Sequence, residues 1–124
     1  MVTSEKQKLL IDLWMLWEER RLDMSDSNLT IIAQIKAKEG MEGHVREELF
    51  KLMAPTRSEP GCIVYDLYQS ADDKQTFMFY ECWMSKRDLE EHLQKPHIKA
   101  FMDKAGGMLK EPLKVSLWEM ISER

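Results

Sequence analysis

Apolar and polar side chains follow two different periods along this chain, and each period predicts a type of secondary structure. Between residues 29 and 37 every second side chain is apolar, which is typical of a strand with one buried face. Residues 62–70, 75–84 and 113–121 are rich in β-branched and aromatic residues, so they are predicted to be strands as well. Residues 71–74 make a turn of hairpin length, which predicts that the second and third strands pair antiparallel.

The N-terminal part of the chain has helical spacing. Residues 3–22 carry leucines and two tryptophans on one side, which predicts an amphipathic helix that must dock on another surface to be stable. The polar residues 23–28 then read as a hinge. We therefore expect two parts, an N-terminal helix with its hinge over residues 1–28 and a main domain over residues 29–124.

The main domain contains further helical patterns. Apolar residues between 45 and 53 recur at helical spacing, and a helix there is expected to stop before the Pro60-Gly61 pair. Ser85 is placed to cap a short helix that runs to about Leu93. Pro96 then opens a last helix, which the glycines at 106–107 are expected to end.

The order strand, helix, strand, strand, helix, strand is that of a ferredoxin-like α+β fold with a split β-α-β arrangement. Its sheet is antiparallel, with the helices on one face. The opposite face is also partly apolar, because Ile32 and Trp118 point away from Ile31 and Leu117. An uncovered apolar face favours a partner, so we expect a homodimer or higher homo-oligomer that packs sheet against sheet.

Composition narrows the class of protein. A length of 124 residues, with 44% hydrophobic and 32% charged residues, fits one globular domain. There is no apolar run of the roughly 20 residues that a membrane span needs, and no signal-peptide pattern at the N-terminus, so a cytoplasmic location is expected. The net charge of −4, with both signs interspersed, argues against nucleic acid as a partner. Cys62 and Cys82 have no zinc-type spacing and are expected to be reduced thiols.

The strand over residues 75–84 carries candidate chemistry. In an extended strand Phe77, Phe79, Glu81 and Trp83 share one face. If that face is buried, Glu81 must be paired or must have a raised pKa. It could then act as a base, or it could hold His92 or an arginine. A buried tryptophan at 83 could equally be a core residue whose indole N–H finds an acceptor.

Two histidines follow this strand and are candidates for proton transfer near neutral pH. His92 and His97 each border an apolar helix face, although a histidine that caps a helix or satisfies a buried carbonyl would lie at the same position. They are five residues apart, they straddle Pro96, and no third ligand has a recognisable spacing, so no metal site is predicted. The third histidine, His44, has charged neighbours and is expected to be solvated.

The segment from Glu81 to Phe101 carries a family resemblance. Its pattern resembles the antibiotic biosynthesis monooxygenase family, most nearly the small bacterial quinol monooxygenases, and the likeness extends over residues 29–121 and includes the Glu59-Pro60-Gly61-Cys62 run. The matching positions are Glu81-x-Trp83-x-Ser85-x-x-x-Leu89-x-x-His92-Leu93-Gln94-x-Pro96-His97-Ile98-Lys99-Ala100-Phe101.

This resemblance implies a dimeric α+β barrel, with a pocket between the sheet and the helices of each subunit. It also implies oxidation of a small quinol or phenolic aromatic by O₂ without flavin, haem or metal, so no cofactor is expected. The implied catalytic residues are His97, His92 and Trp83. The implied substrate contacts are Phe77, Phe79, Glu81 and Phe101.

Three positions separate the chain from other branches that it resembles. The haem-degrading relatives have an asparagine and an iron-binding histidine where this chain has Ala33 and Leu93, so haem is not expected. The antibiotic-tailoring enzymes have a polar amide where this chain has Phe79. Two alternatives stay open: an isomerase or lyase of a small sugar-derived signal, which Phe77 and Phe79 as pocket walls would disfavour, and a non-catalytic dimeric ligand-binding or stress module.

Overall fold

A computed structural model describes residues 28–122, and its elements follow the predicted order. The predicted helix over residues 3–22 lies outside the described residues. None of the described helices is long and apolar enough to cross a membrane. The strands are β1 (Leu29–Lys36), β2 (Cys62–Gln69), β3 (Thr76–Trp83) and β4 (Lys114–Trp118), and the helices are α2 (Glu42–Arg57), α3 (Lys86–Leu93) and α4 (Pro96–Met108).

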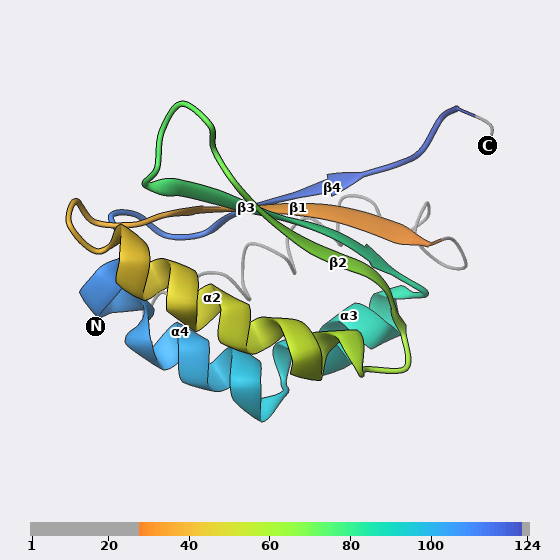
Figure 1. The fold of residues 1–124 in the computed structure, drawn as a ribbon. Coiled ribbons are helices and arrows are strands. Elements are labelled where there is room, and N and C mark those ends of the chain that lie inside the picture. Colours follow the sequence, from red (N-terminus) through yellow and green to blue (C-terminus); the bar gives the residue numbers. More distant parts are fainter. Residues whose placement is uncertain (1–27, 123–124) are drawn as a thin grey trace, which may run out of the picture.

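The strands form one antiparallel sheet in the order β2-β3-β1-β4. In the central pair, Ile31 of β1 lies opposite Glu81 of β3, and Ile35 lies opposite Phe77. Helices α2, α3 and α4 all lie on one face of this sheet (Figure 1). The predicted α+β fold, with an antiparallel sheet and helices on one face, is confirmed, and the strand order is that of the split β-α-β arrangement.

The core lies between the sheet and the helices. Alternate residues of β1 are buried, as the period of two predicts, while Gln34 is exposed. All four residues of the predicted β3 face, Phe77, Phe79, Glu81 and Trp83, are also buried. The helices contribute the apolar side chains Val45, Leu49, Leu52, Ile98, Phe101, Met102 and Ala105. Burial of each large apolar side chain contributes about 1.5–3 kcal/mol, so this layer supplies most of the stability.

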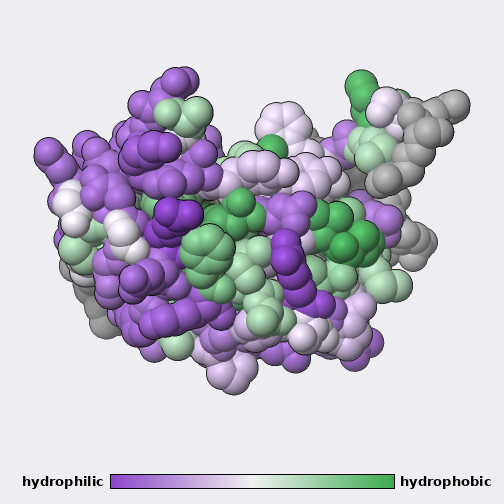
Figure 2. Space-filling model, viewed as in Figure 1, coloured by the Kyte–Doolittle hydropathy of each residue, from purple (hydrophilic) through white to green (hydrophobic). Residues whose placement is uncertain are grey.

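The outer face of the sheet is partly apolar, as predicted. Trp118 lies opposite Thr30, and Tyr68 lies opposite Met78. Trp118 and Tyr68 are 55% and 51% exposed. Apolar side chains among polar ones also reach the surface on the side that carries β2 and α2 (Figure 2). A homodimer built on the outer face of the sheet stays a prediction.

Two element boundaries differ from those that the sequence predicts. Helix α4 does not end at Gly106-Gly107 but continues to Met108, because neither glycine adopts the positive φ of a helix-ending turn and Met108 is buried in the core. The last strand covers only Lys114–Trp118. Trp118 lies opposite Thr30 and β1 begins at Leu29, so residues beyond 119 have no residue of β1 to pair with.

The junction between α3 and α4 is fixed by local sequence. The hydroxyl oxygen of Ser85 accepts a hydrogen bond from the backbone N–H of Asp88 at 3.2 Å, which confirms the predicted N-cap of α3. Pro96 begins α4, where its missing N–H is not needed. The two helices are therefore separated by a short turn, which brings His92, at the end of α3, close to His97, at the start of α4.

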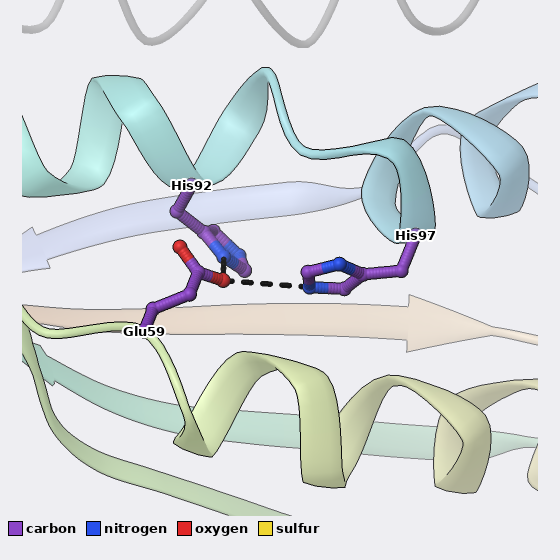
Figure 3. Close-up of side chains that lie close together, drawn as sticks. All are labelled: Glu59, His92 and His97. Carbon is purple, nitrogen blue, oxygen red and sulfur yellow. Dashed lines mark hydrogen bonds and ion pairs between the residues drawn. The ribbon is translucent and has the colours of Figure 1, made fainter.

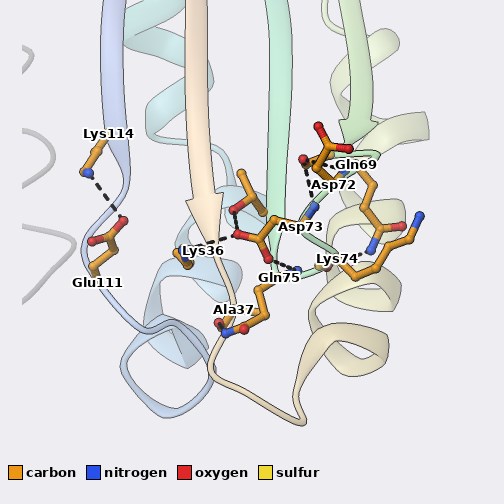
Figure 4. Close-up of polar contacts among 11 residues, drawn as sticks. Lys36, Ala37, Gln69, Asp72, Asp73, Lys74, Gln75, Glu111 and Lys114 are labelled. Atoms are coloured by element: carbon orange, nitrogen blue, oxygen red, sulfur yellow. Dashed lines mark hydrogen bonds and ion pairs between the residues drawn. The ribbon is translucent and has the colours of Figure 1, made fainter.

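Polar contacts hold the hairpin between β2 and β3 and tie it to β1 (Figure 4). Asp73 accepts hydrogen bonds from the backbone N–H of Gln75 and the hydroxyl of Thr76, and it pairs with Lys36 at 3.3 Å. These bonds lower the pKa of Asp73. The Gln75 amide donates to the carbonyl of Ala37. Because a shift of one residue would turn every side chain to the other face, this anchor helps to keep the buried face of β3 inward.

Gly61 supports a first prediction about stability. A Cβ atom at this position would overlap the carboxyl group of Asp88, which belongs to the first turn of α3. The Gly61 carbonyl also accepts a hydrogen bond from Met84, so the backbone cannot easily move away. We expect Gly61→Ala to lower the free energy of unfolding by about 1–3 kcal/mol, measured by urea denaturation.

Gly43 provides the matched control. It lies in the first turn of α2, and a Cβ there meets no atom within 4 Å. Gly43→Ala should therefore leave the stability unchanged or raise it by about 0.5–1 kcal/mol. If Gly61→Ala unfolded at the same urea concentration as the wild type, close packing at this position would be disproved.

Candidate functional site

A cavity lies between the sheet and the helices. It encloses about 60 Å³, room for about four to six water molecules. Three of its lining side chains are polar: Tyr65, Glu81 and His92. The others are Ile31, Ala33, Ile35, Leu49, Leu52, Phe79, Leu89, Leu93, Ile98, Phe101, Met102, Leu113 and Val115. Among the described residues, no lysine or arginine lines the cavity.

Glu81 is held inside the cavity by β3. Its side chain is only 6% exposed, and one of its carboxyl oxygens, Oε1, accepts a hydrogen bond of 2.9 Å from the indole N–H of Trp83. Burial raises the pKa of Glu81 to about 7, with the hydrogen bond from Trp83 opposing this rise. At neutral pH a large share of Glu81 is therefore protonated. Its hydrogen-bond partner is the Trp83 indole, and His92 bonds to Glu59 instead.

Tyr65 reaches the cavity from β2. Its ring stacks on Phe79 with centroids 4.5 Å apart, and it lies opposite Glu81 in the pairing of β2 with β3. Burial raises the pKa of Tyr65 well above its usual value, and its hydroxyl shares a hydrogen bond with Thr56. The phenol therefore stays protonated at neutral pH and remains a hydrogen-bond donor.

His92 lines the cavity from the end of α3. It is 3% exposed, and its ring lies against the Trp83 ring, with centroids 4.5 Å apart. Its Nδ1 lies 2.7 Å from Oε2 of Glu59, which follows α2. Burial lowers the pKa of His92 to about 3, so the ring is neutral at pH 7. A neutral ring at this distance donates Nδ1–H to the carboxylate.

His97 stands behind His92 at the start of α4. Its Nε2 lies 3.4 Å from the same Glu59 oxygen and 3.0 Å from the hydroxyl of Thr56. One carboxyl oxygen thus lies between two imidazoles that come from different helices (Figure 3). Burial raises the pKa of Glu59, and the nearby His97 opposes that rise. His97 is not among the residues that line the cavity.

The predicted site residues therefore divide into two groups. Phe79, Glu81, His92 and Phe101 line the cavity. Phe77, Trp83 and His97 do not, although Trp83 contacts both Glu81 and His92 from behind. His44 is exposed, as expected.

Three polar residues of this region were not predicted from the sequence: Glu59, Tyr65 and Thr56. Glu59 was part of the Glu59-Pro60-Gly61 run, but nothing in that run indicates that its carboxyl group meets two histidines more than 30 residues away. The chain offers three tyrosines, and only the packing of β2 on β3 selects Tyr65 for the cavity.

Comparison with known proteins gives a family match. The sequence model described as "Antibiotic biosynthesis monooxygenase" matches residues 28–104. Rv0793 of Mycobacterium tuberculosis, named as a candidate monooxygenase, is 32% identical over 97 residues, which cover 78% of this chain and 95% of that protein. The crystal structure of PA3566 from Pseudomonas aeruginosa superposes with a TM-score of 0.74 and 33% identity, over 80% of this chain and 98% of that one.

A Synechocystis protein, sll1783, is 29% identical over 100 residues, or 77% of this chain. The matched region spans only 65% of that relative's length. The similarity in each comparison covers about three quarters of the chain.

Proposed function

Because this chain belongs to the antibiotic biosynthesis monooxygenase family, we propose that it is a cofactor-independent monooxygenase that oxidises a small quinol or phenol with O₂. The observation that carries this proposal is a mostly apolar pocket between the sheet and the helices with a buried carboxyl group whose pKa is about 7. In such an enzyme the deprotonated substrate is itself the reductant. A quinol supplies all four electrons that reduce O₂, so one oxygen atom enters the ring, the other leaves as water, and the product is a hydroxyquinone.

The walls of the cavity suit a flat aromatic substrate. Phe79 and Phe101 contribute aromatic faces, and the remaining walls are aliphatic. A phosphorylated sugar would need a cationic group, and no lysine or arginine lines the cavity among the described residues. The alternative of a phosphosugar isomerase therefore has no support from this cavity.

Glu81 is the proposed proton acceptor. A general base works best when its pKa lies near the working pH, and a pKa of about 7 satisfies this condition. His92, with a pKa of about 3, would hold a proton far less well. The proposed role of Tyr65 is to donate a hydrogen bond to the oxyanion that forms when the substrate loses its proton. His92 gives its single N–H to Glu59, so its proposed role is to form part of the cavity wall. In this scheme the hydrogen bond from Trp83 lowers the pKa of Glu81, and the Trp83 ring holds the orientation of His92.

Oxygen consumption tests the proposal. Purified protein, freed of metals by a chelator, is expected to consume O₂ and to form hydroxyquinone when it is supplied with one- and two-ring quinols. The quinol stocks are prepared without O₂ and are assayed in aerated buffer in which they autoxidise slowly. The matched control is the mono- or dimethyl ether of each quinol, whose blocked hydroxyl groups limit or prevent ionisation. Absence of uptake above the buffer rate across the panel would contradict the proposal and favour a non-catalytic binding module.

A further inference from the structure

Glu59, His92 and His97 form a cluster of potential metal ligands, and the proposed oxidation assigns no role to Glu59 or His97. The ligand-type atoms of this cluster are Oε2 of Glu59, Nδ1 of His92 and Nε2 of His97, and all three lie within 4.8 Å of one another. The carboxyl oxygen lies 2.7 Å from the first nitrogen and 3.4 Å from the second. Figure 3 shows the three side chains converging on one point from the loop after α2, the end of α3 and the start of α4.

The donor set is one that transition metals prefer. Two imidazole nitrogens and one carboxylate bind Zn²⁺ in many enzymes and also suit Fe²⁺ and Co²⁺. An imidazole binds a metal through a ring nitrogen that carries no proton, and one ring nitrogen of each histidine faces the Glu59 carboxylate. Ligands about 2.1 Å from a tetrahedral ion lie ~3.4 Å apart, so the observed spacing needs only small side-chain shifts.

The backbone holds these positions without a metal. Glu59 donates its N–H to the carbonyl of Thr56, and its own carbonyl accepts from Cys62. The turn between α3 and α4 is closed by two hydrogen bonds, from Gln94 to the Glu91 carbonyl and from Lys95 to the His92 carbonyl. A site preorganised in this way loses little conformational entropy on binding an ion.

We propose that Glu59, His92 and His97 form a binding site for one divalent transition-metal ion of the Zn²⁺ type. The ion takes the place of the proton that His92 now shares with Glu59, that proton moves to Nε2 of the same ring, and water or the Thr56 hydroxyl takes the fourth position. Thr56 is suitably placed, since its hydroxyl lies 3.0 Å from Nε2 of His97. His92 is also part of the cavity wall, so an ion here sits beside the cavity without needing any lining residue other than His92.

The proposed oxidation does not require this ion, because it is measured on metal-free protein. The site could not be predicted from the sequence, because the two histidines lack a third ligand at a recognisable spacing. Glu59 supplies that ligand from a distant part of the chain, 33 residues before His92.

Metal titration of the full chain, with any affinity tag removed, tests the proposal. Chelator-treated protein is titrated with Zn²⁺ by calorimetry and with Co²⁺ by visible absorption, whose d–d bands report nitrogen and oxygen ligation. We expect one ion per chain and a rise in the melting temperature with Zn²⁺. Binding well below one equivalent would mean that the cluster is a hydrogen-bonded junction only, and it would overturn the proposal.

Three variants locate the ion. His97→Gln and Glu59→Gln should weaken Zn²⁺ binding beyond the roughly 10- to 100-fold that loss of an outer partner costs. His97 is the safer change for folding, because its side chain is 19% exposed. His44→Gln is the matched control, since His44 is exposed on α2, and it should bind as the wild type does. Wild-type affinity in both His97→Gln and Glu59→Gln would overturn the proposal even if the chain binds zinc elsewhere.

Discussion

Replacing Glu81 by glutamine is expected to lower kcat/KM for quinol oxidation at pH 8 by about 100-fold or more. Glutamine keeps the shape of the side chain and can still accept the hydrogen bond from Trp83. It cannot take a proton from the substrate. A fall in kcat/KM would therefore report the loss of proton transfer, because the packing of the side chain is unchanged. Activity within about threefold of the wild type would exclude Glu81 as the proton acceptor.

The pH profile of the wild type gives a second measure of the same role. A base must be ionised to act, so kcat/KM should rise as the pH rises through about 7, the pKa of Glu81. Trp83→Phe removes the hydrogen bond that stabilises the Glu81 carboxylate. The pKa of Glu81 should then rise further, and the midpoint of the profile should move to higher pH. If the midpoint is the same in Trp83→Phe and the wild type, the pH profile does not report the ionisation of Glu81.

The same carboxyl group should make stability depend on pH. Its folded-state pKa of about 7 lies above the pKa of 4.5 that a solvated glutamate has in the unfolded chain. The stabilisation is therefore fully present below pH 4.5 and is lost as the pH rises through about 7. The loss amounts to about 3 kcal/mol at pH 8. Glu81→Gln should escape this loss, so it should be more stable than the wild type at pH 8 relative to pH 5.

Urea denaturation at several pH values measures this difference. Glu59, Tyr65 and His92 also face this region and titrate in both proteins, so the difference between wild type and Glu81→Gln reports Glu81 together with its coupling to Glu59 and Tyr65. The measurement belongs in chelator-containing buffer, which keeps metal binding out of the comparison. A variant that loses activity while it gains stability at high pH would be typical of a strained catalytic group.

Truncation of Trp83 should produce the largest loss of stability in the chain. Its side chain is fully buried, it packs on His92, and its N–H satisfies Glu81. Trp83→Ala would leave a cavity and an unpartnered carboxyl oxygen, so we expect a loss of about 3–5 kcal/mol in the free energy of unfolding.

Phe50→Ala is the matched control for this truncation. Phe50 is also aromatic, but it lies on α2 with 54% of its surface exposed and contacts the Arg46 guanidinium. Its removal should cost about 1 kcal/mol or less in urea denaturation. If the two variants lost similar stability, Trp83 could not be the central core residue that its burial indicates.

Much of the fold could be predicted because its signals are local. The period of two in β1 fixed which residues of that strand are buried, and Ser85 and Pro96 fixed where α3 and α4 begin. The predicted ends, at Gly106-Gly107 for α4 and at residue 121 for β4, were wrong. Whether a glycine ends a helix, or a strand continues, depends on which partner the rest of the fold provides.

The sequence by itself determined the order of the elements, the family, and the side of β3 on which Phe79, Glu81 and Trp83 lie. Only the tertiary structure decided that Tyr65 is the tyrosine of the cavity and that Glu59 lies between His92 and His97. Periodicity reports which face of an element a side chain occupies, because that is set by backbone geometry within a few residues. It carries no information about which residue of another element will lie opposite, since that depends on how the helices pack across the sheet.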